Sequence, residues 1–338
     1  MPARAPSAPR AWTKPARLRP GDTVAVVAPA GPVPHLRLTQ GIATLERLGL
    51  HVRLGAGVLS QTRYLAGDDR TRALDLVSLW ANPSVKAVFC ARGGYGSARI
   101  VDVLTPAFLA KHPKIFCGFS DITTLHEACA RARLVSFYGP MAAWDLAHGA
   151  HRAPKTRAGA RRLIAGARVT TSGGFDEASL RAMLFGASKG YRMAPAGGEA
   201  LVKGRATGRL LGGCLSLLAA SLGTPGQLDT RGAILLLEDE MEPPYRMDRM
   251  LTQLRRAGMF DRVRGIVLGD FPECEPDRGA GYALVDVLRD RLGDLGVPVL
   301  WRFPFGHTAR PNLTLPLGVR ATLDATRGAL TIDESVTR

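Results

Sequence analysis

Residues 114–125 read KIFCGFSDITTL, an apolar run that leads directly into Ser120 and then into a helical pattern. Residues 114–119 predict a buried strand and residues 122–132 predict a helix. Two earlier stretches, TVAVVA (23–28) and VKAVFC (85–90), are also strand-like and are each followed by a glycine-containing turn and helical spacing. Strands that alternate with helices predict a parallel sheet with crossover helices. The N-terminal part is therefore expected to be a Rossmann-like α/β domain over residues 20–150.

The second half predicts another α/β domain, with mixed strands, over residues 206–338. A length of 338 residues also favours two domains, because one core seldom organises that many. Residues 151–205 are rich in Gly, Pro and Arg and predict a basic connector between the domains. The elements expected in the second domain are helices at 214–222 and 247–257, strands at 233–237, 265–268 and 297–303, and a hairpin of residues 320–325 and 329–333.

The formal net charge of +16 raises the possibility of an acidic partner such as nucleic acid. Eleven of these excess charges lie in two segments without acids, residues 1–20 and 151–168. Aromatic residues do not interleave with these basic residues as a binder of single strands would require. We therefore expect solvated basic segments and no nucleic-acid partner.

The chain has no apolar run of about 20 residues, so no membrane span is expected. The basic N-terminus is not followed by the apolar stretch of a signal peptide, which predicts a cytoplasmic protein. The five cysteines are scattered and include no CxxC pair, which argues against disulfides and against a zinc–thiolate site. We expect neither a metal nor an organic cofactor.

Ser120 stands where a strand passes into a helix, a position that exposes a hydroxyl at the edge of a sheet. The first helical N–H groups beside such a serine can stabilise an oxyanion. The alternative is that Ser120 simply caps the helix. The stretch ARGGYGS (91–97) also follows a strand, and its glycines allow the backbone to approach a ligand closely. An ordinary βα turn is the alternative there.

Two further stretches contain candidate catalytic residues. The buried strand before Glu238 ends in a run of acids, EDEME (238–242), which is suited to orient a histidine, to bind a cation or to cap the next helix. His307 follows Gly306 in a proline-rich loop, where it is placed to reach a cleft or to remain a surface residue.

Taken together, these stretches resemble the LD-carboxypeptidase (muramoyltetrapeptide carboxypeptidase) family of serine peptidases, which includes microcin-immunity hydrolases. The resemblance covers residues 21–319 in the family's order. It rests on the following stretches: GDTVAVVAPAGPV (21–33), ARGGYG (91–96), GFSDIT (118–123), GGCLSLLAASLGTP (212–225), ILLLEDEMEPPYRMDRMLTQL (234–254) and FGHTARPNLTLPLGV (305–319).

The resemblance implies a role for each matching residue. Ser120 would be the nucleophile, His307 the base and Glu238 the acid that orients it. The backbone N–H groups of Gly94 and Asp121 would form the oxyanion hole, and Gly93 and Tyr95 would contact the substrate. Cys214 stands where the family commonly has Asn, so the local packing or pocket lining there is expected to differ.

The function implied is a cytoplasmic, homodimeric hydrolase that removes the terminal D-alanine from muropeptides during peptidoglycan recycling. A microcin-immunity-like hydrolase of peptidyl-nucleotide amides is the alternative within the family. An alternative of another class is a non-catalytic protein that binds acidic ligands or nucleic acid.

Overall fold

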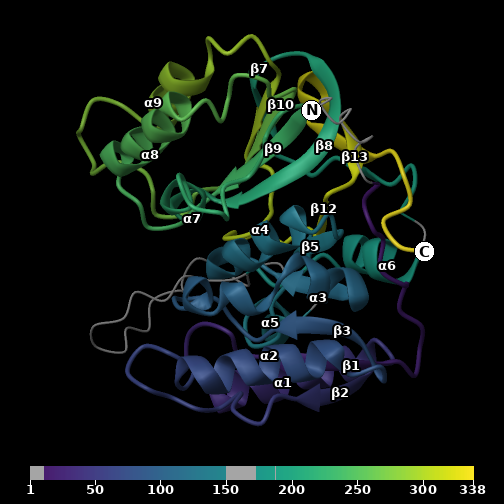
Figure 1. The fold of residues 1–338 in the computed structure, drawn as a ribbon. Coiled ribbons are helices and arrows are strands. Elements are labelled where there is room, and N and C mark those ends of the chain that lie inside the picture. The colour runs from purple at the N-terminus through teal and green to yellow at the C-terminus, as the bar shows by residue number, and fades with distance from the viewer. Residues whose placement is uncertain (1–10, 150–172, 187) are drawn as a thin grey trace, which may run out of the picture.

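The computed structural model describes residues 11–149, 173–186 and 188–338. Two sheets form two bodies, with the N-terminal half in purple and blue and most of the C-terminal half in green and yellow in Figure 1. The predicted α/β fold, with a mostly parallel first sheet and a mixed second sheet, is confirmed. Residues 1–10 of the first basic segment and all of the second, residues 151–168, lie outside the described residues.

The first sheet has six strands in the order β12-β5-β4-β3-β1-β2. Strands β1 to β5 are parallel, whereas β12 (Leu315–Leu317) comes from the far end of the chain and pairs antiparallel with β5 (Figure 1). The parallel strands are β1 (Thr23–Val27), β2 (His51–Leu54), β3 (Val85–Cys90), β4 (Ile115–Gly118) and β5 (Ser136–Tyr138). The helices among them are α1 (His35–Arg47), α2 (Asp69–Ala81), α3 (Pro106–Lys111), α4 (Thr123–Arg131) and α5 (Asp145–His148), with 3₁₀ turns η1 (Ser97–Arg99), η2 (Val101–Val103) and η3 (Ser120–Ile122).

The register of this sheet brings the ends of its central strands together. Val27 pairs with Cys90 and Phe89 pairs with Cys117, so β1, β3 and β4 finish at one edge. These strands are continuous apolar runs because helices cover both faces of a parallel sheet. The glycine loop after β3 and the serine turn after β4 therefore leave the sheet side by side, at the edge where ligands bind in such folds.

The second sheet has eight strands in the order β6-β14-β13-β8-β9-β10-β11-β7. Strands β8 to β11 are parallel and the outer pairs are antiparallel. Helices α7 (Leu215–Ala220), α8 (Pro244–Arg256) and α9 (Leu284–Leu292) lie together on one side of it (Figure 1). The strands are β6 (Arg192–Met193), β7 (Glu199–Val202), β8 (Arg205–Cys214), β9 (Ala233–Glu238), β10 (Gly265–Leu268), β11 (Val299–Trp301), β13 (Arg320–Asp324) and β14 (Ala329–Ile332), the last two joined by η4 (Ala325–Arg327).

Strand β9 shows why the run before Glu238 is wholly apolar. Ile234 and Leu236 join the same buried cluster as the core of the first domain. Leu235 and Leu237 face the other way and join a second cluster with residues of α7, α8 and α9. Because both faces of β9 are buried, no position of the strand tolerates a polar residue until the strand ends at Glu238.

Two local expectations need correction, and one strand was not foreseen. Residue 214 does not begin a helix, because the long strand β8 runs up to Cys214 and α7 starts after it. The described part of the expected connector contains α6 (Glu177–Phe185), β6 and β7, and these two strands extend the second sheet. Strand β12 was not expected at all. The domain bounds 20–150 and 206–338 stay a prediction.

The longest described helices, α1, α2 and α8, have 13 residues each. Among the described residues, no helix combines the length and the apolar character needed to cross a membrane.

Candidate active site

Ser120 occupies a strained turn between β4 and α4. Its φ is +64°, in the left-handed region that residues other than glycine rarely adopt. Phe119 before it is extended, and the 3₁₀ turn η3 then leads into α4. The N-cap of α4 is Ile122, so Ser120 does not serve as the cap of that helix. The turn places the Ser120 side chain at the wall of a cavity.

The glycine loop after β3 packs directly against this serine. A Cβ on Gly93 would lie 2.8 Å from Cβ and 2.9 Å from Oγ of Ser120, and 3.3 Å from the backbone N of Asp121. The loop is held from the other side, where the N–H of Gly31 donates to the carbonyl of Gly93 at 3.0 Å. Gly94 follows with a φ of +110°, a conformation that L side chains rarely adopt. The sequence therefore needs glycines here for close approach to the serine.

A buried arginine that the sequence did not single out supports the same loop. Arg72 of α2 donates from Nη1 to the carbonyl of Gly96 at 2.8 Å and also to the carbonyl of Pro29. These bonds join the ends of the loops that follow β1 and β3. An arginine on a helix gives no local signal of this role, because its partners lie 24 and 43 residues away.

Asp121 and Tyr95, the other two residues expected near the serine, lie in different surroundings. The Asp121 carboxylate is buried and accepts from the backbone N–H of Ser97 at 2.8 Å. Burial raises the pKa of this carboxyl despite that hydrogen bond. Tyr95 is exposed and stacks edge-on against Tyr64, in a neighbouring hollow that shares Arg92 and Gly94 with the serine cavity.

Glu238 and His307 are in direct contact. Oε2 of Glu238 accepts from Nδ1 of His307 at 2.7 Å and from the backbone N–H of His307 at 2.8 Å. Burial alone would lower the pKa of His307, but Glu238, Glu240 and Asp239 outweigh it and raise that pKa to about 9. The preceding Gly306 has a φ of +68°, and a Cβ there would lie 2.3 Å from Cδ of Glu238. Glycine is what allows the His307 loop to reach the acid.

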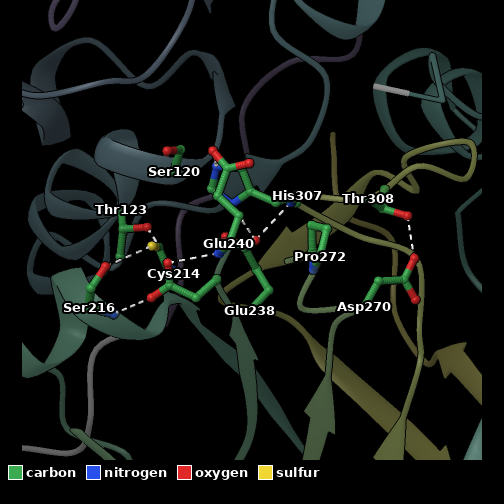
Figure 2. A network of polar contacts seen from close by, with 12 residues as sticks. Ser120, Thr123, Cys214, Ser216, Glu238, Glu240, Asp270, Pro272, His307 and Thr308 are labelled. Carbon is green, nitrogen blue, oxygen red and sulfur yellow. Dashed lines mark hydrogen bonds and ion pairs between the residues drawn. The ribbon is translucent and has the colours of Figure 1, made fainter. Parts of the chain in front are cut away.

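The other ring nitrogen of His307 faces a second acid. Nε2 lies 3.2 Å from Oε1 of Glu240, and Figure 2 shows the Glu240 carboxylate beside the imidazole, with Ser120 nearby. Ser120 and His307 line one cavity of about 230 Å³, which draws on both domains. Its other lining residues are Arg92, Gly93, Gly94, Phe119, Met141, Trp144, Glu240 and Met241.

The loop that carries His307 is anchored by a residue missing from the sequence predictions. Asp270, just after β10, accepts from Nε of Arg310 at 3.0 Å and from the hydroxyl of Thr308 (Figure 2). The side chain of Asn312 accepts from the backbone N–H of Gly306 at 3.1 Å. An acid within two residues of the end of a buried strand is close to the signal that marked Glu238, and it would have identified Asp270.

The remaining acids and Cys214 have separate partners. Asp239 accepts from the backbone N–H groups of Ser216 at 2.8 Å and Glu240 at 2.9 Å, and burial together with Glu238 raises its pKa to about 6. The N–H of Cys214 donates to the hydroxyl of Thr123 at 3.0 Å, and burial holds the pKa of its thiol well above the usual range. Among the residues that the structure describes, no group of His, Cys, Asp and Glu is arranged to hold a metal ion.

The sequence matches the models of two domains. Residues 24–139 match the LD-carboxypeptidase N-terminal domain and residues 207–323 match the LD-carboxypeptidase C-terminal domain. A putative carboxypeptidase of Streptomyces coelicolor is 47% identical over 330 residues, which cover 96% of this chain and 97% of the relative. A probable murein peptide carboxypeptidase of Bacillus subtilis is 38% identical over 326 residues, which cover 96% of this chain and 95% of the relative.

Solved structures are similar over the same length. A muramoyltetrapeptide carboxypeptidase from Oxalobacter formigenes has a TM-score of 0.76 and 32% identity, with 92% of this chain and 99% of that chain covered. The microcin C7 self-immunity protein MccF has a TM-score of 0.82 at 24% identity, over 96% of this chain and 100% of its own, which shows a shared fold. With both domain models matched in order and relatives this similar across nearly the whole chain, the protein belongs to the LD-carboxypeptidase family, peptidase family S66.

Proposed function

We propose that this enzyme is a serine LD-carboxypeptidase that removes the terminal D-alanine from a murein tetrapeptide, with Ser120, His307 and Glu238 as its catalytic triad. The observation that carries the proposal is that His307, bound to the buried Glu238, lines the same cavity as Ser120 on its strained turn. The names of the Bacillus and Oxalobacter relatives support a murein peptide as substrate.

In the proposed reaction, Nε2 of His307 takes the Ser120 proton as Oγ bonds to the scissile carbonyl carbon. The C–N bond then breaks, and the same proton passes to the leaving amine of D-alanine. His307 next deprotonates a water molecule, which attacks the acyl-enzyme and restores Ser120. Glu238 binds Nδ1 throughout, so it fixes the tautomer and stabilises the imidazolium.

The negative charge that develops on the carbonyl oxygen needs donors beside Ser120. We assign this role to the backbone N–H groups of Gly94 and Asp121. The support is the contact of Gly93 with Ser120, which brings the loop N–H groups to the start of η3. Each such donor contributes about 3 kcal/mol of transition-state stabilisation in comparable hydrolases.

A carboxypeptidase must also recognise a free terminal carboxylate, and Arg92 is the arginine that lines the cavity. Its side chain is half-buried and donates from Nη1 to the carbonyl of Pro32 at 3.2 Å, which leaves its other guanidinium N–H groups for a ligand. We therefore assign the substrate carboxylate to Arg92. Guanidinium groups bind carboxylates with two parallel hydrogen bonds, which would orient the terminal residue.

The test is Ser120→Ala, assayed on a murein tetrapeptide and on a peptidyl-nucleotide amide. We expect normal folding and a loss of turnover by several orders of magnitude, because members of a triad act as a unit. Ser78→Ala, on the exposed face of α2, is the matched control and should keep full activity. Full activity of Ser120→Ala would refute the proposal. Faster turnover of the nucleotide conjugate by the wild type would favour the microcin-immunity alternative.

The homodimer and the cytoplasmic location implied by the family resemblance also stay predictions. Sedimentation of the purified protein at several concentrations measures the first, and fractionation of cells that produce it measures the second.

A further inference from the structure

Both ring nitrogens of His307 lie beside carboxylates in this structure. Nδ1 contacts Glu238 at 2.7 Å, and Nε2 contacts Oε1 of Glu240 at 3.2 Å (Figure 2). Nε2 is the atom that the proposed reaction needs for the Ser120 proton. Because a ring nitrogen presents a single N–H or a single lone pair, Nε2 cannot serve Glu240 and Ser120 at once. Glu240 therefore competes with the Ser120 hydroxyl for Nε2 in the cavity that all three residues line.

The backbone of Glu240 is fixed, whereas its carboxylate is at the end of a side chain with rotatable bonds. Its N–H donates to Oδ1 of Asp239 at 2.9 Å, and the next N–H, of Met241, donates to the carbonyl of Pro272 at 3.0 Å. Met241 has a φ of +58°, which marks a tight turn at this point. The Glu240 side chain keeps 25% exposure in the cavity wall. Rotation about its side-chain bonds is enough to remove the carboxylate from Nε2.

The second oxygen of this carboxylate lacks a protein partner. Oε2 of Glu240 is buried and has no hydrogen-bond donor among the residues that the structure describes. A buried anionic oxygen without a donor is costly, and a substrate that fills the cavity removes the remaining water. The occupied enzyme is therefore stabilised by a ligand that brings a donor, preferably a cation, to Glu240.

We propose that Glu240 blocks the base in the free enzyme and releases it when an ammonium group of the substrate binds its carboxylate. This inference rests on the proposed function, because it assigns Nε2 as the proton acceptor. The matching substrate is a peptide with a basic side chain on the residue whose carbonyl is cleaved. Arg92 at the carboxylate end and Glu240 at the ammonium end would then recognise a peptide that carries both charges.

The charges around His307 support this assignment. Three carboxylates at the end of β9 act on the imidazole, with Glu238 at Nδ1 and Glu240 at Nε2, and Arg92 is a cation in the lining of the same cavity. Two carboxylates on one imidazole keep it protonated, which is consistent with its pKa of about 9. A protonated imidazole cannot accept the Ser120 proton. Removal of one carboxylate from Nε2 lowers the pKa of the ring and so favours the neutral form that catalysis needs. The described titratable or charged groups that face the ring or its acids are Glu238, Asp239, Glu240, Arg92, Tyr138, Cys214 and Cys274.

The first test needs no substrate. The His307 imidazole is titrated by NMR in ¹⁵N-histidine-labelled wild type, Glu240→Gln and Glu46→Gln. Glutamine keeps the shape but not the charge, so the pKa of His307 should fall by about 1 to 3 in Glu240→Gln. Glu46 is exposed on α1, and its variant removes the same charge with no expected change. An unchanged pKa in Glu240→Gln would overturn the proposed block, whatever the enzyme cleaves.

The second test uses two peptides that end in D-alanine and differ only at the preceding residue, which is lysine or Nε-acetyl-lysine. Wild type and Glu46→Gln should prefer the free amine by about tenfold or more in kcat/KM. In Glu240→Gln this ratio should approach one, with faster turnover of the acetylated peptide. A ratio that is the same in wild type and Glu240→Gln would overturn displacement by a cation. Failure of the proposed function itself would be distinct, because neither peptide would then be cleaved by the wild type.

Discussion

The hydroxyl of Tyr138 joins the serine turn of the first domain to the buried acid of the second. Tyr138, at the end of β5, donates to Oε1 of Glu238, at the end of β9. The same hydroxyl accepts from the backbone N–H of Ser120 at 3.2 Å. Burial and the adjacent Glu238 hold the pKa of Tyr138 well above its usual range, so this group stays a neutral donor. One oxygen atom therefore sets the distance between the two halves of the site.

Tyr138→Phe removes this link while keeping the ring. Oε1 of Glu238 loses a buried donor, so the free energy of unfolding should fall by about 1 to 3 kcal/mol in a urea titration. The value of kcat/KM should fall by about tenfold or more, because the acid and the serine turn are no longer held together. Tyr282→Phe, at an exposed tyrosine, should change neither quantity. Wild-type kinetics in Tyr138→Phe would show that the link is not needed for catalysis.

Gly93→Ala tests the close approach of the glycine loop to Ser120. The added methyl group would stand 2.8 Å from Cβ of Ser120, so the loop or the serine must shift. A misplacement of this size should lower kcat/KM by about 100-fold. The control is Gly198→Ala, where the nearest atom lies at an ordinary 3.5 Å and full activity is expected. If Gly93→Ala turned over like the control, the loop would not position the nucleophile.

Gly306→Ala tests whether the glycine before His307 is needed for contact with Glu238. Gly296 has the same φ of +68° but no atom within 4 Å of an added Cβ, so Gly296→Ala measures the backbone strain alone, about 1 to 2 kcal/mol. At Gly306 the Cβ would also overlap the Glu238 carboxylate. The free energy of unfolding should therefore fall further than in the control, and activity should be lost in Gly306→Ala only. Equal losses in both variants would exclude the overlap as the cause.

The charge of His307 predicts how stability depends on pH. The pKa of His307 is about 9 in the folded protein, above the value of about 6.5 expected in the unfolded chain. The contribution of protonated His307 to the free energy of unfolding is therefore complete below about pH 6.5 and is lost as the pH rises through about 9. The difference in unfolding free energy between wild type and His307→Gln, measured by urea titration across pH 6 to 10, should decrease as pH rises. A difference that grows with pH would contradict the prediction.

Much of the fold could be predicted because its signals are local. The runs at 85–90 and 265–268 coincide with β3 and β10, since buried parallel strands require continuous apolar residues. Strand β8 was missed because its first half is polar and partly exposed, and its glycines resemble a loop. Strand β12 is only three residues long and includes a proline, so no local pattern marks it.

The sequence by itself determined the alternation of strands and helices and the family, and it drew attention to Ser120, Glu238 and His307. Only the tertiary structure decided which side chains meet. Tyr138 and Glu238 are 100 residues apart, and Asp270 and Arg310 are 40 apart. Glu238 and Glu240 stand in the same acidic run, yet they contact opposite nitrogens of one imidazole. Periodicity and turn chemistry act over a few residues, whereas contacts across a domain interface depend on sheet order and packing.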